Sequence, residues 1–127
     1  MPCFLAAVLA APAVAAGPPS TLKATVRKTS STSRDVMIVN HATKTYKGFF
    51  INSTDSPKIT ATSNKSCKLG TSPWTSKGKK HVDYWADCSA SVRAGKTLDI
   101  KLATSGSGTI FVWAKINGRQ YKIGTGG

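Results

Sequence analysis

The sequence predicts an all-β domain, either an antiparallel β-sandwich or a small barrel of about seven to eight strands with one disulfide. Three observations predict this fold. Apolar and polar residues alternate over several short stretches, turn-forming residues separate these stretches, and no segment beyond residue 16 shows an extended helical apolar period. A chain of 127 residues has room for one domain.

The N-terminal segment predicts export. Residues 1–16, MPCFLAAVLAAPAVAA, form an apolar run that ends in small residues suited to signal peptidase; the alternative is a buried N-terminal helix. The run is too short to span a bilayer, so we expect no transmembrane segment in the mature chain. Cleavage removes Cys3 and leaves Cys67 and Cys88, a pair that predicts a disulfide rather than a metal site. We therefore expect residues 17–127 to form a single secreted β-domain, extracellular or periplasmic and monomeric.

Four strands are expected in the first half of the chain. Residues 22–27 alternate apolar with basic or polar side chains, the period of a half-buried strand. Residues 36–39 are a continuous apolar run, as in a central strand covered on both faces. Residues 45–52 are rich in aromatic side chains, and residues 59–62 form a short strand after the Asp-Ser-Pro turn at 55–57.

The segment 67–88 contains two of the three tryptophans and the densest run of lysines. We expect its terminal cysteines to close a loop, which stabilises the fold by about 3 kcal/mol in the chain-entropy model. From 82 to 92 every second residue is apolar or small, which predicts a strand. This alternation turns Asp83, Trp85 and Asp87 away from the core.

Residues 97–102 continue the alternation after a turn at 93–96 and predict a hairpin with the preceding strand. The arrangement resembles the turn between strands of many bacterial immunoglobulin-like sandwiches. The resemblance covers residues 82–102 and implies an immunoglobulin-like fold.

Asn117-Gly118 is the strongest hairpin signal in the chain. Both residues tolerate the positive φ angles of a type I′ turn, whose twist matches that of paired strands. A two-residue loop places Trp113 opposite Lys122 and Val112 opposite Ile123. The outward face of this hairpin is expected to carry Phe111, Trp113, Lys115, Gln120 and Lys122.

The charge balance predicts attraction to polyanions. Eighteen Lys and Arg residues oppose five acids, which gives a net charge of +13. Expected partners are a polysaccharide or another polyanion at a cell surface, with nucleic acid and anionic membrane as alternatives. A solvated surface without a specific partner is the simpler interpretation.

Trp85 is the most informative candidate for binding. An exposed indole flanked by the carboxylates of Asp83 and Asp87 suits a sugar, because the ring stacks on pyranose C–H groups and the acids accept hydroxyl hydrogens. The alternative is that Trp85 is covered and belongs to the core. Trp113, opposite Lys122, is a second candidate, and the alternative there is a cation–π pair that only stiffens the hairpin.

The other candidates lie between the two cysteines. Trp74 is either a contact residue or a plug at one end of the sandwich. A basic cluster of Lys77, Lys79, Lys80 and His81 suits phosphate or sulfate groups, whereas its simpler interpretation is a solvated loop tip. Lysines beside aromatic residues also suit anionic glycans or single-stranded nucleic acid.

No cofactor, metal or catalytic site is predicted. His41 and His81 are the only imidazoles, no Gly-x-Ser-x-Gly motif occurs, and no ligand spacing suits a metal. We therefore expect a secreted, cationic, non-enzymatic module that binds a glycan or an anionic cell-surface polymer. The alternatives are a secreted effector or toxin-like protein acting on anionic membranes, cell walls or nucleic acid, and a small secreted ribonuclease that uses both histidines.

Overall fold

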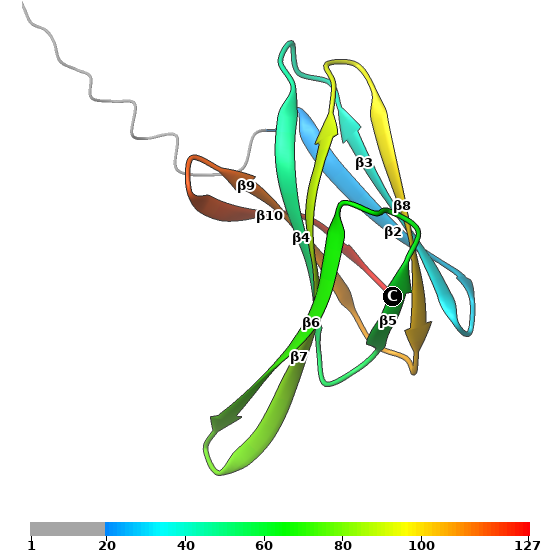
Figure 1. Cartoon of the computed structure of the whole chain (residues 1–127), viewed down its shortest axis with the longest axis vertical. Coiled ribbons are helices and arrows are strands. Elements are labelled where there is room, and N and C mark those ends of the chain that lie inside the picture. The colour runs from blue at the N-terminus through cyan, green and yellow to red at the C-terminus, as the bar shows by residue number, and fades with distance from the viewer. Residues whose placement is uncertain (1–19) are drawn as a thin grey trace, which may run out of the picture.

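The computed structural model describes residues 20–127, and the expected signal peptide, residues 1–16, lies outside this range. Residues 20–127 fold into two antiparallel sheets (Figure 1), and within them there is no helix that is long and apolar enough to cross a membrane. The strands are β2 (Leu22–Ser30), β3 (Ser33–Asn40), β4 (Tyr46–Thr54), β5 (Lys58–Thr62), β6 (Cys67–Ser76), β7 (Lys79–Val92), β8 (Thr97–Ser105), β9 (Ile110–Ile116) and β10 (Arg119–Gly126).

The predicted sandwich is confirmed, and the alternative of a small closed barrel is wrong. One sheet has the strand order β10-β9-β4-β7-β6, and the other has the order β2-β3-β8-β5. The sheets approach each other closely where β10 meets β2. A Cβ atom on Gly124 would lie 2.0 Å from the carbonyl oxygen of Ala24, so this contact requires a residue without a side chain.

The core lies between the sheets and follows the alternation along each strand. The inward residues of β4, β7 and β9 pack against those of β3 and β8 because a period of two places them on one face of each strand. The side chains with no exposed surface include Val36, Ile38, Phe49, Ile51, Ala86, Cys88, Ile100, Ile110 and Val112.

Residues 20–127 form nine strands, one more than the upper end of the predicted range, because residues 67–76 are a strand and not a loop. β6 and β7 form a long hairpin that extends beyond the two sheets (Figure 1). Lys77 and Gly78 make its turn with φ angles of 50° and 77°, the positive values of a type I′ turn. The sequence gives no apolar alternation in β6 because most of its residues are exposed to solvent.

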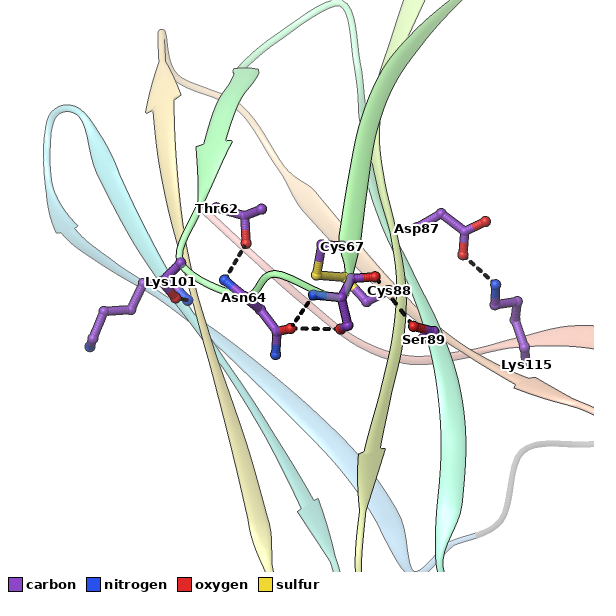
Figure 2. Close-up of a disulfide and its surroundings, with 10 residues drawn as sticks. Thr62, Asn64, Cys67, Asp87, Cys88, Ser89, Lys101 and Lys115 are labelled. Carbon is purple, nitrogen blue, oxygen red and sulfur yellow. Dashed lines mark hydrogen bonds and ion pairs between the residues drawn. A yellow bond between two sulfur atoms is a disulfide. The ribbon is translucent and has the colours of Figure 1, made fainter.

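The predicted disulfide between Cys67 and Cys88 is confirmed. The two cysteines face each other across β6 and β7 (Figure 2), so the bond joins the base of a hairpin rather than closing an irregular loop. The disulfide therefore anchors the projecting hairpin to the buried part of β7, where Cys88 has no exposed surface.

The β9–β10 hairpin has the predicted type I′ turn, with φ angles of 52° at Asn117 and 78° at Gly118. Trp113 lies opposite Lys122, as predicted. Val112 lies opposite Gly124 and not Ile123, because the pairing shifts by one residue after Lys122.

Candidate functional site

Aromatic side chains gather on the outer face of the five-stranded sheet. Ile51, Ala86 and Val112 have no exposed surface, whereas the residues next to them in sequence turn outward and are half-buried. Trp74 on the projecting hairpin is 41% exposed. We call this surface the aromatic face; its rings are Phe50, Trp74, Trp85, Phe111 and Trp113.

Strand register brings four of these rings together at one place. Trp85 of β7 and Phe111 of β9 both lie opposite Asn52, which occupies the strand between them. In the next row Phe50 lies beside Trp113. Because paired strands are about 4.8 Å apart, these side chains form one continuous surface.

Each of the three indoles is held by a hydrogen bond within this face. In every case the ring N–H donates to a side chain on a neighbouring strand, so the polar edge of the indole is satisfied and its orientation is fixed. The bonds run from Nε1 of Trp113 to Oδ1 of Asn52 (2.8 Å), from Nε1 of Trp85 to Oγ of Ser72 (3.0 Å) and from Nε1 of Trp74 to Oδ1 of Asp83 (3.1 Å).

The indole of Trp85 lies against the backbone of β6. A Cβ atom on Gly70 would be 2.2 Å from Cζ2 of this indole, so only glycine leaves room for the ring here. On its other side the ring is near-parallel to that of Phe50, with centroids 6.1 Å apart and an angle of 26° between the planes. Trp85 is therefore a half-buried residue of the outer face. It lies outside the core between the sheets, and β6, part of the segment between the two cysteines, covers one part of its ring.

The two acids beside Trp85 face outward, as the alternation predicts. Oδ1 of Asp83 accepts hydrogen bonds from Trp74 and from Oγ1 of Thr54 (3.0 Å). Oδ1 of Asp87 is paired with the ammonium group of Lys115 (Figure 2). Within residues 20–127 no partner is found for the second oxygen of either carboxylate, which leaves one acceptor on each for a ligand hydroxyl.

The outer part of the hairpin is tied to the β4–β5 turn. The ring of His81 stacks on that of Trp74, with centroids 4.3 Å apart, and its Nδ1–H donates to Oδ2 of Asp55 (2.7 Å). The backbone N–H of Val82 donates to Oδ1 of the same carboxylate (2.9 Å). These two hydrogen bonds, that of His81 above all, hold the pKa of Asp55 below its ordinary value of 3.8.

The lysines of the expected basic cluster lie at the end of the hairpin, and all three are exposed. Lys79 lies opposite Ser76 and, by alternation, on the same side of the ribbon as His81, whereas Lys80 points to the other side. Lys77 is in the turn. These residues are therefore close to Trp74 but not to the rings at the centre of the sheet.

Lys122 does not make the expected cation–π contact with Trp113. Its ammonium nitrogen lies over the ring of Phe111 instead, 5.7 Å from the centroid. The contact runs diagonally across the β9–β10 pair, and it leaves the indole of Trp113 to its hydrogen bond with Asn52.

The two histidines are not brought together. His41 follows Asn40, whose side chain donates to the carbonyl oxygen of Val92 at the end of β7, whereas His81 is near the beginning of that strand. Eleven residues of β-strand between 81 and 92 span about 36 Å. The paired acid–base arrangement expected of a ribonuclease is therefore absent, and residues 20–127 hold no cluster of three or more potential metal ligands.

Sequence reasoning missed the polar and aromatic residues that complete the aromatic face. These residues are Phe50, Asn52, Gly70 and Ser72, and the pairing of Lys115 with Asp87 was likewise not predicted, although the outward direction of Lys115 was. Asn52 attracts attention in the sequence only as part of an Asn-Ser-Thr glycosylation pattern. Alternation around 49–52 separates two faces of β4 but does not reveal that β7 and β9 flank it.

No protein-family model and no curated protein matches the chain. Among solved structures, it is similar to ChBD2 from Thermococcus kodakarensis KOD1, with 14% identity over 87% of this chain and 99% of the other and a TM-score of 0.43. It is also similar to an inactive mutant of a GH20 exo-β-N-acetylglucosaminidase from Vibrio harveyi, with 10% identity, 80% of this chain covered and a TM-score of 0.41. This chain spans 16% of the length of that enzyme. At these TM-scores the likeness carries no argument about function.

Proposed function

We propose that the protein is a secreted, non-enzymatic module that binds a glycan on its aromatic face. The observation that carries this proposal is the fixation of three indoles on one outer sheet face by hydrogen bonds to Asn52, Ser72 and Asp83. Fixed rings bind with a small loss of conformational freedom, so more of the contact energy remains as affinity.

The chemistry of the face suits a sugar. Aromatic rings offer large apolar surfaces to the C–H side of a pyranose, and the free oxygens of Asp83 and Asp87 can accept hydrogen bonds from its hydroxyl groups. The amide nitrogen of Asn52, at the centre of the rings, has no acceptor within residues 20–127 and can donate to a sugar oxygen.

The extent of the face favours a polymer over a monosaccharide. Trp74 lies opposite His81, which is four residues from Trp85 along β7, a separation of about 13 Å. Trp113 lies two strands from Trp85 in the opposite direction. A ligand that contacts all three indoles is therefore extended.

The test is a binding panel read by tryptophan fluorescence and by retention on insoluble polysaccharides. We expect at least one neutral or acidic polysaccharide to bind, and Trp85→Ala to weaken that binding by about tenfold or more, which corresponds to about 1.4 kcal/mol. Truncating an aromatic side chain in a protein core typically lowers the free energy of unfolding by about 3–5 kcal/mol. Because Trp85 is only half-buried, we expect Trp85→Ala to lower it by less than this.

Met37→Ala is the matched control, since Met37 is a half-buried apolar residue on the outer face of the other sheet. It should leave binding unchanged. A panel in which no polysaccharide binds, or a Trp85→Ala protein that binds as tightly as the wild type, would refute the proposal.

A further inference from the structure

We infer that the tip of the β6–β7 hairpin, formed by Lys77, Lys79 and Lys80, binds acidic groups of the glycan, so that the ligand is an anionic polysaccharide. The inference rests on the proposed function and adds the chemical class of the ligand. Three observations support it: the partners of the carboxylate groups, the position of the hairpin tip relative to the aromatic face, and the contacts that fix the hairpin.

Every carboxylate side chain already has a partner other than the hairpin tip. The chain contains five acids, all of them Asp and all within the described residues. Their partners are Arg27 and Lys101 for Asp35, His81 for Asp55, Trp74 and Thr54 for Asp83, Lys115 for Asp87, and Lys101 for Asp99. Within residues 20–127 no ion pair joins an acid to Lys77, Lys79 or Lys80, so the hairpin tip carries local positive charge that attracts an anionic ligand.

Lys79 of the hairpin tip continues the aromatic face, whereas Lys77 in the turn and Lys80 on the other side of the ribbon add to the local positive charge. Lys79 is two residues beyond His81 and six residues beyond Trp85 along β7, on the same side of the ribbon. Six residues of strand span about 20 Å, so one extended polymer can contact both the central rings and the lysines. Figure 1 shows that the hairpin projects away from the two sheets, which leaves its tip open to a large ligand.

The hairpin is held in place before any ligand binds. Its base is fixed by the disulfide between Cys67 and Cys88, and its middle is fixed by the contacts of Asp55 with His81 and Val82. A two-residue type I′ turn sets the register of the tip. Lysines on a pre-organised ribbon lose less freedom on binding than lysines on a mobile loop.

The experiment compares two soluble polymers with one backbone, carboxymethyl cellulose and hydroxyethyl cellulose, at about 0.15 M ionic strength, where charges separated by more than about 8 Å are screened. We expect the wild type to bind the acidic polymer about tenfold more tightly than the neutral one. The triple variant Lys77→Gln, Lys79→Gln, Lys80→Gln should lose this preference.

A second triple variant, Lys23→Gln and Lys28→Gln on β2 with Lys96→Gln in the turn before β8, removes the same charge from exposed lysines that form no ion pair within residues 20–127 and should keep the preference. All three tip lysines are exposed, so melting temperatures near that of the wild type are expected and check that the variants fold. A tip variant that keeps the preference, or a control triple variant that loses it equally, would overturn the inference, because the effect would then belong to net charge alone.

Two further measurements separate this inference from the proposed function. Trp85→Ala should weaken binding of both polymers equally; if it changes neither, the glycan-binding proposal fails and this inference fails with it. If Trp85→Ala weakens both while the tip variant keeps the preference, only this inference fails. Tip-dependent binding that is tighter for single-stranded oligothymidylate than for carboxymethyl cellulose would assign the hairpin to nucleic acid instead.

Discussion

Gly70 shows how one missing side chain positions a ring of the aromatic face. The indole of Trp85 reaches across from β7 and covers the backbone of Gly70 on β6, and its N–H then meets the hydroxyl group of Ser72, two residues further along the same strand. The position of the ring is therefore set by the missing side chain of Gly70 and by one hydrogen bond to Ser72. Both residues belong to β6, a strand with few apolar residues.

Gly70→Ala should displace the indole of Trp85. The new methyl group would lie 2.2 Å from Cζ2 of this indole, so the ring must move away. We expect the displaced ring to weaken polysaccharide binding, but by less than Trp85→Ala does. We expect a changed tryptophan emission spectrum and weaker binding with a modest loss of stability, because the three atoms nearest to the new methyl group all belong to one half-buried indole on the protein surface. Fluorescence spectra, binding isotherms and thermal melts check this.

Thr75→Ala, an exposed change further along the same strand, is the control and should behave as the wild type does. A Gly70→Ala protein with the wild-type spectrum and affinity would show that the position of the Trp85 indole does not depend on Gly70.

At the scale of elements, the β6–β7 hairpin depends on anchors outside itself. An isolated two-stranded hairpin is marginally stable in water, and most of β6 is exposed. Asp55 supplies one anchor. Its backbone N–H donates to the carbonyl oxygen of Val82 (2.7 Å), and its carboxylate accepts hydrogen bonds from the backbone N–H of Val82 and from the ring of His81. Asp55 adopts a φ of 66°, a conformation that Asp and Asn tolerate better than most residues.

This anchor should weaken in acid. The pKa of Asp55 in the folded protein is below 3.8, so its carboxylate stabilises the fold above that pH, and the stabilisation is lost as the pH falls through the lowered value. Asp55→Asn keeps the backbone conformation but removes the charge. We expect this variant to melt below the wild type near pH 5, and the difference to shrink as the pH approaches about 2.

Thermal melts of both proteins across this range are the measurement. Asp99→Asn serves as the control, because Asp99 is exposed and makes only a long ion pair with Lys101 (3.5 Å), so it should change the melting temperature little at any pH. A difference between the wild type and Asp55→Asn that stays constant from pH 5 to about 2 would show that the carboxylate is not the source of the stabilisation.

At the scale of the whole molecule, charge is unbalanced. The net charge is +13 on 127 residues, and among the lysines and arginines within residues 20–127 only Arg27, Lys101 and Lys115 form ion pairs with an acid, so most of them carry uncompensated charge. This excess of positive charge repels itself, which opposes the compact state. It also attracts any polyanion, so only binding that survives moderate salt and depends on particular residues indicates a specific site.

Added salt should therefore stabilise the protein. Raising NaCl from about 0.01 M to about 0.15 M shortens the screening length from about 30 Å to about 8 Å, and the melting temperature should rise as repulsion is screened. NaCl is preferred to sulfate, which stabilises proteins by exclusion from their surface. A melting temperature that falls over this range would mean that the ion pairs of Asp35 and Asp87 outweigh the repulsion.

The sequence by itself determined the fold class, the disulfide and the outward direction of Trp85. It also determined the turn type at Asn117-Gly118 and the strand register next to that turn. These features depend on local periodicity and turn chemistry, which a strand expresses within a few residues. β6 was not predicted because a strand exposed on both faces has no apolar period. The predicted register fails beyond Lys122 because β10 has one extra residue there, which a two-residue period does not reveal.

Only the tertiary structure decided which residues share the aromatic face. β4 lies between β7 and β9, which are distant in sequence, and this order places Asn52 among Trp85, Phe111 and Trp113. Strand order is set by burial of all inner faces at once, and no single stretch of sequence contains it. The alternation showed that an indole faces outward, but the neighbours that turn it into a candidate binding surface come from other strands.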